Sequence, residues 1–413
     1  MTEKRQDFAP VIVLGLWLLF VIVGLTGFVL SRYYVPEFEG AYASVSSLRQ
    51  TGWLSFVQGI HYFGSAALIV GGGVSVLSLL WLGRFGWADR HLWWSCLLAA
   101  LCAVGFQMTG NLLPASAHDV RTAFTEASIV RGVPWVGQQL SDAILAGSEV
   151  STATFERWYM LHSVVVPILA LVGALIGVRG GRRALSSASL RIVVAVPTLV
   201  VVVMALSLQP PLGAAATAGD SMGGTVQPMW YVLPMHSLLV AAQGISPSAG
   251  WVGAIGLPAL LALLAAAMPI FVRGRKGVAP RPFGKAIAIC GVVVLLLCAL
   301  SFSDGFQGVL DDSPPEPLKG AGDEASSGPI DARLAKVGAS LAKKHCLGCH
   351  LIRGEGHKIG PELSHVGRRR QNAESLVQLL RDPAKFGGTI MPSFSKLGDD
   401  NLRALAEYLR SLR

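Results

Sequence analysis

The stretch Cys346-Leu347-Gly348-Cys349-His350 places two cysteines three positions apart and a histidine directly after the second. This spacing is typical of covalent haem c attachment, because each thiol can add to one haem vinyl group and the imidazole can then ligate the iron. A zinc half-site is the alternative, but such a site needs a second cysteine pair, and the sequence contains none. We therefore predict one covalent haem c, with Cys346 and Cys349 as thioether residues and His350 as an iron ligand.

The residues around this motif predict a small helical domain over 332–413. Leu334–Lys344 predicts a helix leading into the motif, and Leu402–Leu412 predicts a terminal helix with apolar residues at helical spacing. Together with Gly360-Pro361-Glu362-Leu363, this order resembles a class I cytochrome c domain. The resemblance implies that Met391 is the second iron ligand, and His/Met ligation favours a relatively high reduction potential. An ordinary core methionine is the alternative.

The rest of the chain is too apolar for a soluble protein. Of the 413 residues 52% are hydrophobic and 14% are charged, and the apolar runs reach the length of about 20 residues that crosses a bilayer. We predict seven membrane spans, at residues 11–33, 56–82, 92–113, 154–178, 190–208, 250–272 and 284–303.

Basic residues set the predicted orientation. They gather before the first span and in every second loop, and seven crossings place all four groups on one side, which is then cytoplasmic. The C-terminus lies on the opposite side, where haem c is attached in cells. The net charge of +9 is largely this signal together with a basic C-terminal domain, so it gives no reason to expect nucleic acid.

Two histidines lie inside predicted spans. A histidine in an apolar span is a functional hypothesis by default, although His61 or His162 taken singly could be a hydrogen-bonded packing residue. The second and fourth spans run in the same direction, and each histidine lies near the non-cytoplasmic end of its span. The pair therefore predicts two imidazoles at similar depth that clamp one haem b iron within a helix bundle.

Several segments make the resemblance specific. The chain resembles cytochrome b of the quinol:cytochrome c and quinol:plastocyanin reductases, in the shorter seven-span form. With its C-terminal domain it resembles a cytochrome b/c fusion subunit of a bacterial (mena)quinol:cytochrome c oxidoreductase. The segments that carry the resemblance are Thr26-Gly27-Phe28, Tyr33-Tyr34, Ala43-Ser44-Val45, Thr109-Gly110, Leu113-Pro114, Val133-Pro134-Trp135-Val136-Gly137, and Arg157-Trp158-Tyr159-Met160-Leu161-His162 with Pro167.

The resemblance implies an all-α protein, a seven-span transmembrane helical bundle of cytochrome b type followed by a small helical class I cytochrome c domain. We expect an N-terminal four-helix bundle over 1–183 and a three-span region over 184–303. A flexible linker over 304–331 and the cytochrome c domain over 332–413 follow. The resemblance further implies a homodimeric complex. We expect a multi-pass protein of the bacterial cytoplasmic membrane, with a cytoplasmic N-terminus and a periplasmic haem c.

The family normally holds two haems b, stacked across the membrane by histidines about fourteen residues apart, or about 21 Å along a helix. Here the positions fourteen after the two histidines are Ser75 and Ile176, with Gly177 one further on, and none ligates iron. The resemblance places pocket glycines at Gly27 and Gly110 and adds Arg157 to the pocket. Fourteen residues before those glycines stand Val13 and Cys96. We therefore predict one haem b, on the non-cytoplasmic side.

The segment Gln227-Pro228-Met229-Trp230-Tyr231 resembles the Pro-Glu-Trp-Tyr signature of the family's quinol-oxidation site. Met229 stands in place of the glutamate that helps to take protons from quinol, and a thioether is no general base. His236 and His118 both lie on the predicted side of the membrane from which they could substitute, and His236 is the nearer in sequence. A hydrogen-bonded or merely exposed histidine is the alternative for His236.

These features predict a membrane electron-transfer subunit of a quinol:cytochrome c reductase-like complex. Its haem c would receive electrons from quinol oxidised at the non-cytoplasmic face, through a separate Rieske-type iron–sulfur protein, and pass them to a soluble cytochrome c or terminal oxidase. With one haem b, a conventional Q cycle is not expected. The alternative is a non-catalytic membrane anchor whose cytochrome c domain is a simple relay.

Overall fold

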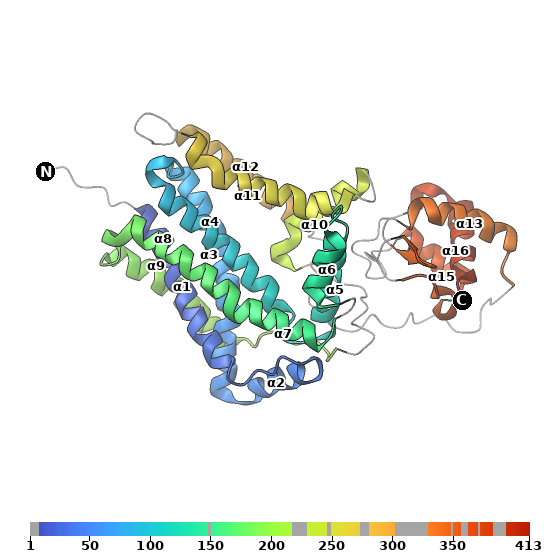
Figure 1. Ribbon diagram of the computed structural model, residues 1–413, viewed down its shortest axis with the longest axis horizontal. Helices are drawn as coiled ribbons and strands as arrows, with labels where there is room; N and C mark the ends of the chain where they lie inside the picture. Colours follow the sequence, from blue (N-terminus) through green and yellow to red (C-terminus); the bar gives the residue numbers. More distant parts are fainter. Residues whose placement is uncertain are drawn as a thin grey trace. The chain divides into compact units, whose positions relative to one another are not determined.

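A computed structural model of the protein describes residues 8–147, 150–216, 229–245, 249–272, 281–301, 329–347, 350–356, 362–370, 372–382 and 394–413. The chain divides into two compact units (Figure 1). The first contains residues 1–119, 151–215 and 258–300, and the second contains residues 120–150, 216–257 and 301–413. The predicted domain boundaries stay predictions, and most of the predicted linker lies outside the described residues.

The first unit is a bundle of long apolar helices. Its elements in chain order are α1 (Phe8–Leu30), α2 (Phe38–Gln50), α3 (Gly52–Leu82), η1 (Trp87–Asp89), α4 (Arg90–Asn111), α7 (Thr152–Met160), η2 (Leu161–Val165), α8 (Val166–Gly181), η3 (Arg182–Ala184), α9 (Ala188–Ser207), α11 (Leu257–Phe271) and α12 (Arg281–Ser301).

Six stretches of the described chain are helices long and apolar enough to cross a membrane. They coincide with the first six predicted spans. The helix α12 lies where the seventh span was predicted, but it is not among these six. The all-α helical fold is therefore confirmed, while the count of seven spans stays a prediction. The six are Phe8–Leu30, Gly52–Leu82, Trp87–Asn111, Thr152–Gly181, Ala188–Ser207 and Val252–Phe271.

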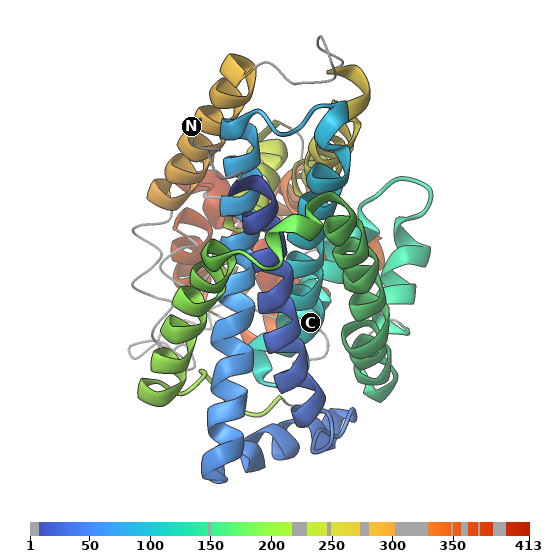
Figure 2. The same ribbon diagram turned by 90° about the vertical axis from the view of Figure 1, so that its left-hand side faces the viewer.

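Helices α1, α3, α4 and α8 pack against one another, and α9 packs on α1 and α3; Figure 2 shows α1 and α3 side by side. Small residues permit close approach, as is usual for membrane helices. A Cβ added at Gly72 would lie 3.2 Å from the backbone of Ala100, and one at Gly59 would lie 2.9 Å from the side chain of Ala205. These contacts bring the apolar faces of the four helices into one core.

The second unit is also helical. Outside one short hairpin, its described elements are α5 (Ala117–Arg131), which begins at the boundary of the first unit, α6 (Gly137–Leu145), η5 (Trp230–Val232), α10 (Leu233–Ile245), η7 (Val252–Gly256), α13 (Ala332–His345), α14 (Val366–Arg369), α15 (Ala373–Arg381), η11 (Ser395–Leu397) and α16 (Asp399–Ser411). The hairpin pairs β1 (Leu351–Ile352) with β2 (Glu355–Gly356) in antiparallel fashion.

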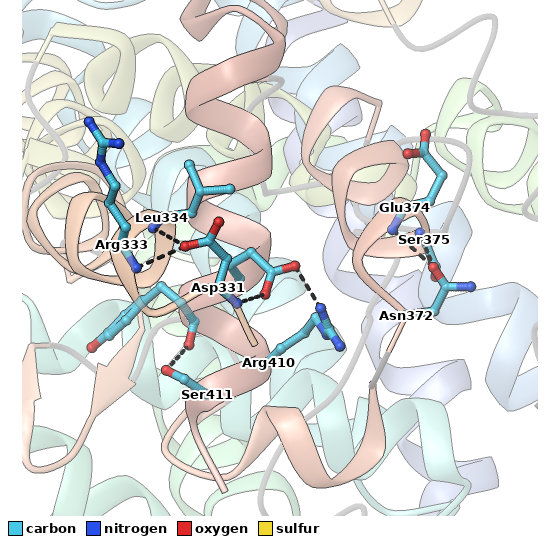
Figure 3. Close-up of polar contacts among 10 residues, drawn as sticks. Asp331, Arg333, Leu334, Asn372, Glu374, Ser375, Arg410 and Ser411 are labelled. Carbon is cyan, nitrogen blue, oxygen red and sulfur yellow. Dashed lines mark hydrogen bonds and ion pairs between the residues drawn. The ribbon is translucent and has the colours of Figure 1, made fainter. Parts of the chain in front are cut away.

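In the C-terminal region, α13 and α16 cross in close contact. A Cβ at Gly338 would lie 2.0 Å from the carbonyl oxygen of Ala404, so only glycine fits at this crossing. The buried Glu407 accepts a hydrogen bond from the Asp331 backbone N–H at 3.2 Å and one from Arg410 at 2.6 Å (Figure 3). The start of α13 is thereby tied to α16.

Side-chain caps fix where two of these helices begin. Asp331 accepts hydrogen bonds from the backbone of Arg333 and Leu334 at the start of α13 (Figure 3). Asn372 does the same for Glu374 and Ser375 at the start of α15. Because such caps satisfy N–H groups that have no partner within the helix, each stabilises its helix start by about 1 kcal/mol.

Candidate functional site

The two histidines predicted from the sequence meet inside the first unit. His61 comes from α3, and His162 comes from the π-helical turn η2. Their ring centroids are 6.0 Å apart, and the ring planes are inclined by 73°. The fold therefore brings together two imidazoles that are separated by about a hundred residues of sequence.

A threonine and a backbone carbonyl hold the His61 ring. Its Nδ1 lies 3.1 Å from the carbonyl oxygen of Val23 and 3.3 Å from Thr26 Oγ1. The Thr26 hydroxyl donates to that same carbonyl at 2.6 Å, so its oxygen is left to accept. Because a carbonyl only accepts, Nδ1 carries the proton, and Nε2 is the nitrogen with a lone pair to offer a metal.

The His162 ring is held in the same way from α4. Thr109 Oγ1 lies 3.0 Å from Nδ1 of His162 and donates its own proton to the carbonyl of Gly105 at 2.7 Å. Because Thr109 gives its own proton to that carbonyl, its oxygen is left to accept from the ring. The proton therefore sits on Nδ1 here too, so both histidines offer Nε2.

A glycine follows each of these threonines and lies against the imidazole. A Cβ at Gly27 would be 2.8 Å from Cε1 of His61, and a Cβ at Gly110 would be 2.8 Å from Cε1 of His162. Real Cβ atoms do not approach this closely, so any larger residue would displace the ring. We call these two threonines, two glycines and two histidines the histidine half of the bundle.

The donor set of the histidine half fits one iron between two imidazoles. An imidazole nitrogen lies about 2 Å from a metal that it ligates, and its ring centre lies about 1 Å further on, so two opposing rings have centres about 6 Å apart. The observed 6.0 Å agrees with this arrangement. The planes of two such rings are free to turn about the common axis, so their 73° inclination is compatible with it.

The turn that carries His162 departs from the α-helix. Residues Leu161–Val165 form a π-helix between α7 and α8, and Pro167 follows in the first turn of α8. Such π-turns are rare and often lie at functional sites, because they rotate the side chains that follow. Arg157, the further pocket residue implied by the resemblance, is partly buried in α7, five residues before His162.

Another part of the first unit is packed quite differently. The buried Trp17 indole fits against α8, where a Cβ at Gly173 would be 2.5 Å from the ring and one at Gly177 would be 3.2 Å from it. Its Nε1 donates to Ser95 Oγ at 2.8 Å, and Ser95 donates to the carbonyl of Gly173 at 2.7 Å. We call Trp17, Ser95, Gly173 and Gly177 the tryptophan half.

The positions predicted to have lost a haem contribute to this packing. Val13 and Cys96 are fully buried in the same apolar core as Trp17. Ser75 is buried and donates to the carbonyl of Gly71 at 2.6 Å. Ile176 is partly buried. No metal-ligating histidine lies at any of these positions, and their space is occupied by protein side chains.

The quinol-type motif lies in the second unit and is described from Met229 onwards. Trp230 begins η5, is 45% exposed, and contacts Tyr231 edge-on with ring centroids 5.8 Å apart. His236 lies one turn into α10 and is buried. This burial lowers the pKa of His236 below its ordinary value, so the ring is neutral near pH 7 and has a lone pair that can take a proton.

A second titratable group of this unit was not found from the sequence. Glu126 lies on α5, is partly buried, and has no hydrogen-bond or ion-pair partner in the described part of the chain. Burial penalises its charged form and raises its pKa to about 8. A lone glutamate in an amphipathic stretch gives no signal that distinguishes it from a solvated one.

Two of the four predicted haem c residues fall within the described parts of the chain. Cys346 directly follows α13, is buried, and its carbonyl accepts a hydrogen bond from the backbone N–H of His350 at 2.8 Å. Cys349 and Met391 lie outside the described residues.

Comparisons with known proteins agree with this architecture. Residues 66–209 match the family described as cytochrome b (N-terminal)/b6/petB, and residues 335–413 match the cytochrome c family. Cytochrome b6 of Mastigocladus laminosus is 30% identical over 156 residues, which cover 37% of this chain and 72% of that protein. The chain belongs to the cytochrome b/b6 family. Cytochrome b6 of Tupiella akineta is likewise 30% identical over 161 residues, covering 37% of this chain and 72% of the relative.

A solved structure shares the fold of this cytochrome b. It is described as a hyperthermophilic respiratory Complex III, with a TM-score of 0.52 and 16% sequence identity, and the match covers 74% of this chain and 91% of that chain. The protein is therefore a cytochrome b/c fusion and a membrane electron-transfer subunit. Its two domains imply haem b and haem c.

The sequence located the histidines and glycines of the site but not the function of the threonines beside them. Thr26 and Thr109 each precede a pocket glycine, and this repeated Thr-Gly pair was the available signal. The fit of Trp17 against two glycines of α8 had no such signal, because a tryptophan in an apolar span is unremarkable before its packing partners are known.

Proposed function

We propose that this chain oxidises quinol, as a subunit of a quinol:cytochrome c reductase-like complex, with one haem b held by His61 and His162. Electrons from quinol at the non-cytoplasmic face leave through haem c to a downstream carrier or oxidase. A haem iron supplies a centre that takes up and releases one electron at a time. The N-terminus is cytoplasmic, and the cytochrome c domain is on the outer face of a bacterial cytoplasmic membrane.

The contrast between the two halves carries the proposal of a single haem b. In the histidine half, the ring centroids of two imidazoles lie 6.0 Å apart, which is about the spacing that one iron needs, and two glycines leave room beside the rings. In the tryptophan half, an indole fills the space against Gly173 and Gly177. A second haem b would lie about 21 Å away, the length of 14 residues of helix. Without it, no intermediate carrier takes electrons toward the cytoplasmic side. Both electrons of each quinol then leave on the outer face.

Other residues of the histidine half orient its two iron-binding histidines. Thr26 and the Val23 carbonyl fix the tautomer and plane of His61, and Thr109 does the same for His162. Hydrogen bonds to the nitrogen that does not bind the metal raise the basicity of a metal-binding imidazole and fix its direction. These hydrogen bonds therefore orient both imidazoles for the iron that they would bind.

The protons of quinol need an acceptor other than Met229. His236 supports this role because it is buried, belongs to the same unit as the motif, and is neutral near pH 7. We assign it as the first candidate base and assign Trp230 and Tyr231 to the quinol site. The complex further requires a Rieske-type iron–sulfur protein and a soluble cytochrome c or terminal oxidase, and we expect it to be a homodimer.

Quinol-dependent reduction of haem c tests this function. The purified complex is mixed with a short-chain menaquinol, and haem c absorbance is followed with and without an inhibitor of quinol oxidation. We expect inhibitor-sensitive reduction that slows strongly in His236→Phe. Reduction at the same rate with the inhibitor present would contradict enzymatic quinol oxidation.

The alternative function is a membrane anchor that carries a haem c relay. The loss of the motif glutamate at Met229 favours it. A membrane anchor does not require two matching sets of a threonine, a glycine and a histidine. A chain that contains haem c but no haem b would establish the anchor.

A further inference from the structure

Two cationic side chains at one end of the first unit lie over exposed tryptophan rings. The Arg90 guanidinium carbon is 4.6 Å from the ring centroid of Trp87, and the Lys285 ammonium nitrogen is 5.0 Å from that of Trp81. Trp87 is 38% exposed and Trp81 is 49% exposed. Each pair therefore presents an apolar surface with a positive charge held above it.

The two pairs lie on either side of the turn that joins α3 to α4, and the start of α12 packs against this turn. Trp81 belongs to the last turn of α3, and Trp87 begins η1. A Cβ added at Gly284 of α12 would clash with the carbonyl oxygen of Leu80. This close approach places Lys285, the next residue of α12, beside Trp81.

Aromatic side chains extend the apolar surface at the same turn. The ring centroid of Phe85 is 6.2 Å from that of Phe283, which lies two residues before Lys285. Phe85 is buried, whereas Phe283 is 49% exposed. The start of α12 thus joins the turn through buried rings and leaves an aromatic ring exposed near the cation.

The positive charges of Arg90 and Lys285 are not neutralised by the protein. Asp89 is the only acid in the segments 81–91 and 281–291. It is buried and accepts a hydrogen bond from Arg84 at 2.9 Å. Arg90 donates to the carbonyl of Trp87 at 3.0 Å. Within the residues that the structure describes, Arg90 and Lys285 form no ion pair.

The usual role of basic residues at this end of a span is to orient the chain in the membrane. That role requires positive charge but no particular contact of the side chain. It does not account for two cations that each lie over an exposed indole, at a turn whose single carboxylate is already paired. The arrangement is instead suited to an amphipathic anion.

We propose that this end of the bundle binds an anionic phospholipid, with the headgroup phosphate at Arg90 and Lys285 and the acyl chains along the exposed aromatic rings. In the orientation proposed above, this end is cytoplasmic. Anionic lipids of the cytoplasmic leaflet attract basic residues by about 1 kcal/mol each, and indole rings lie at headgroup level. A free phosphate ion would leave the aromatic surface unused. The inference does not depend on haem b or on quinol oxidation.

The experiment counts bound lipid by native mass spectrometry on the full-length, delipidated protein in detergent. The probes are dioleoyl phosphatidylglycerol and dioleoyl phosphatidylcholine, which share acyl chains and differ in net charge. The variants are Arg90→Gln, Lys285→Gln, Trp81→Leu and Trp87→Leu. Arg191→Gln is the matched control, because Arg191 is an exposed arginine at the start of α9, on the same predicted side of the membrane.

We expect wild-type protein to bind phosphatidylglycerol at least tenfold more tightly than phosphatidylcholine. Each glutamine variant should weaken phosphatidylglycerol binding about fivefold, the effect of one lost basic residue, and should leave phosphatidylcholine binding unchanged. Each leucine variant should weaken it about threefold, the effect of one lost cation–ring contact. Arg191→Gln should bind both lipids as the wild type does.

Equal affinity of the wild type for the two lipids would overturn the inference. So would glutamine variants that bind phosphatidylglycerol as tightly as Arg191→Gln does, since the site would then lie elsewhere. A last arm adds excess inorganic phosphate at constant ionic strength. Complete displacement of phosphatidylglycerol by phosphate would show a site for the free ion and would also contradict the proposal.

Discussion

The histidine half and the tryptophan half use glycine for opposite ends. In the first, Gly27 and Gly110 clear space for two imidazoles whose ring centroids lie 6.0 Å apart. In the second, Gly173 and Gly177 clear space that the indole of Trp17 then fills. At these four positions glycine permits a close approach, and the group that approaches decides between a cofactor pocket and a packed core.

The largest expected effect is on the histidine half itself. His61→Ala or His162→Ala removes one of the two iron ligands, so we expect haem b content to fall from one per chain to nearly none. Haem c content should be unchanged, because that group is attached elsewhere in the chain. Pyridine haemochrome spectra measure both. His91→Ala, at the start of α4, is the matched control, and equal haem b loss in that variant would show that the effect is not specific.

Trp17→Ala probes the tryptophan half. Removing a buried tryptophan leaves a cavity, and we expect the free energy of unfolding to fall by about 3–5 kcal/mol, as measured by thermal unfolding in detergent. Trp135→Ala is the control, since Trp135 is 95% exposed. Haem b content should stay at one per chain, because no histidine is present there. Binding of a second haem b by the Trp17 variant would contradict the claim that the tryptophan half is no haem site.

Gly27→Ala and Gly110→Ala test how closely the imidazoles pack against the helix backbone in the histidine half. The added Cβ would lie 2.8 Å from an imidazole carbon, so the ring must shift, and overpacking of this kind costs about 1–3 kcal/mol. We expect weaker haem b retention on gel filtration. Gly24→Ala is the matched control, because a Cβ at Gly24 meets nothing within 4 Å. Equal retention in all three variants would contradict the tight fit.

Thr26→Val and Thr109→Val should give the smallest effect. Each keeps the shape of the side chain and removes one hydrogen bond to a histidine, worth about 1 kcal/mol. We expect haem b to stay bound with a shift of about fivefold in its reduction equilibrium, read by redox titration. Thr198→Val is the control, since the Thr198 hydroxyl donates to the carbonyl of Val194 within its own helix. An unchanged haem b potential would show that the two threonines do not position the histidines.

Much of the fold could be predicted from the sequence because the length of an apolar run reports directly on membrane crossing. Six spans agree with the structure, and the pairing of His61 with His162 followed from their similar depth in parallel spans. The π-turn that carries His162 could not be predicted, because it changes the hydrogen-bond register without changing the apolar pattern.

The tryptophan half lay beyond sequence reasoning for a different reason. The absence of histidine at Ser75 and Ile176 predicted the loss of a haem site, but not which side chains pack there. Trp17 reaches glycines on α8 only because α1 and α8 pack together. Such a contact depends on helix rotation and crossing, which a composition pattern does not contain.

The central claim is one haem b per chain, in the histidine half. The ratio of haem b to haem c in the purified full-length protein tests it most directly, because haem c is counted in the same spectrum. We predict a ratio of one to one. A ratio of two to one would contradict the account, since it would require a second haem b where Trp17 is packed.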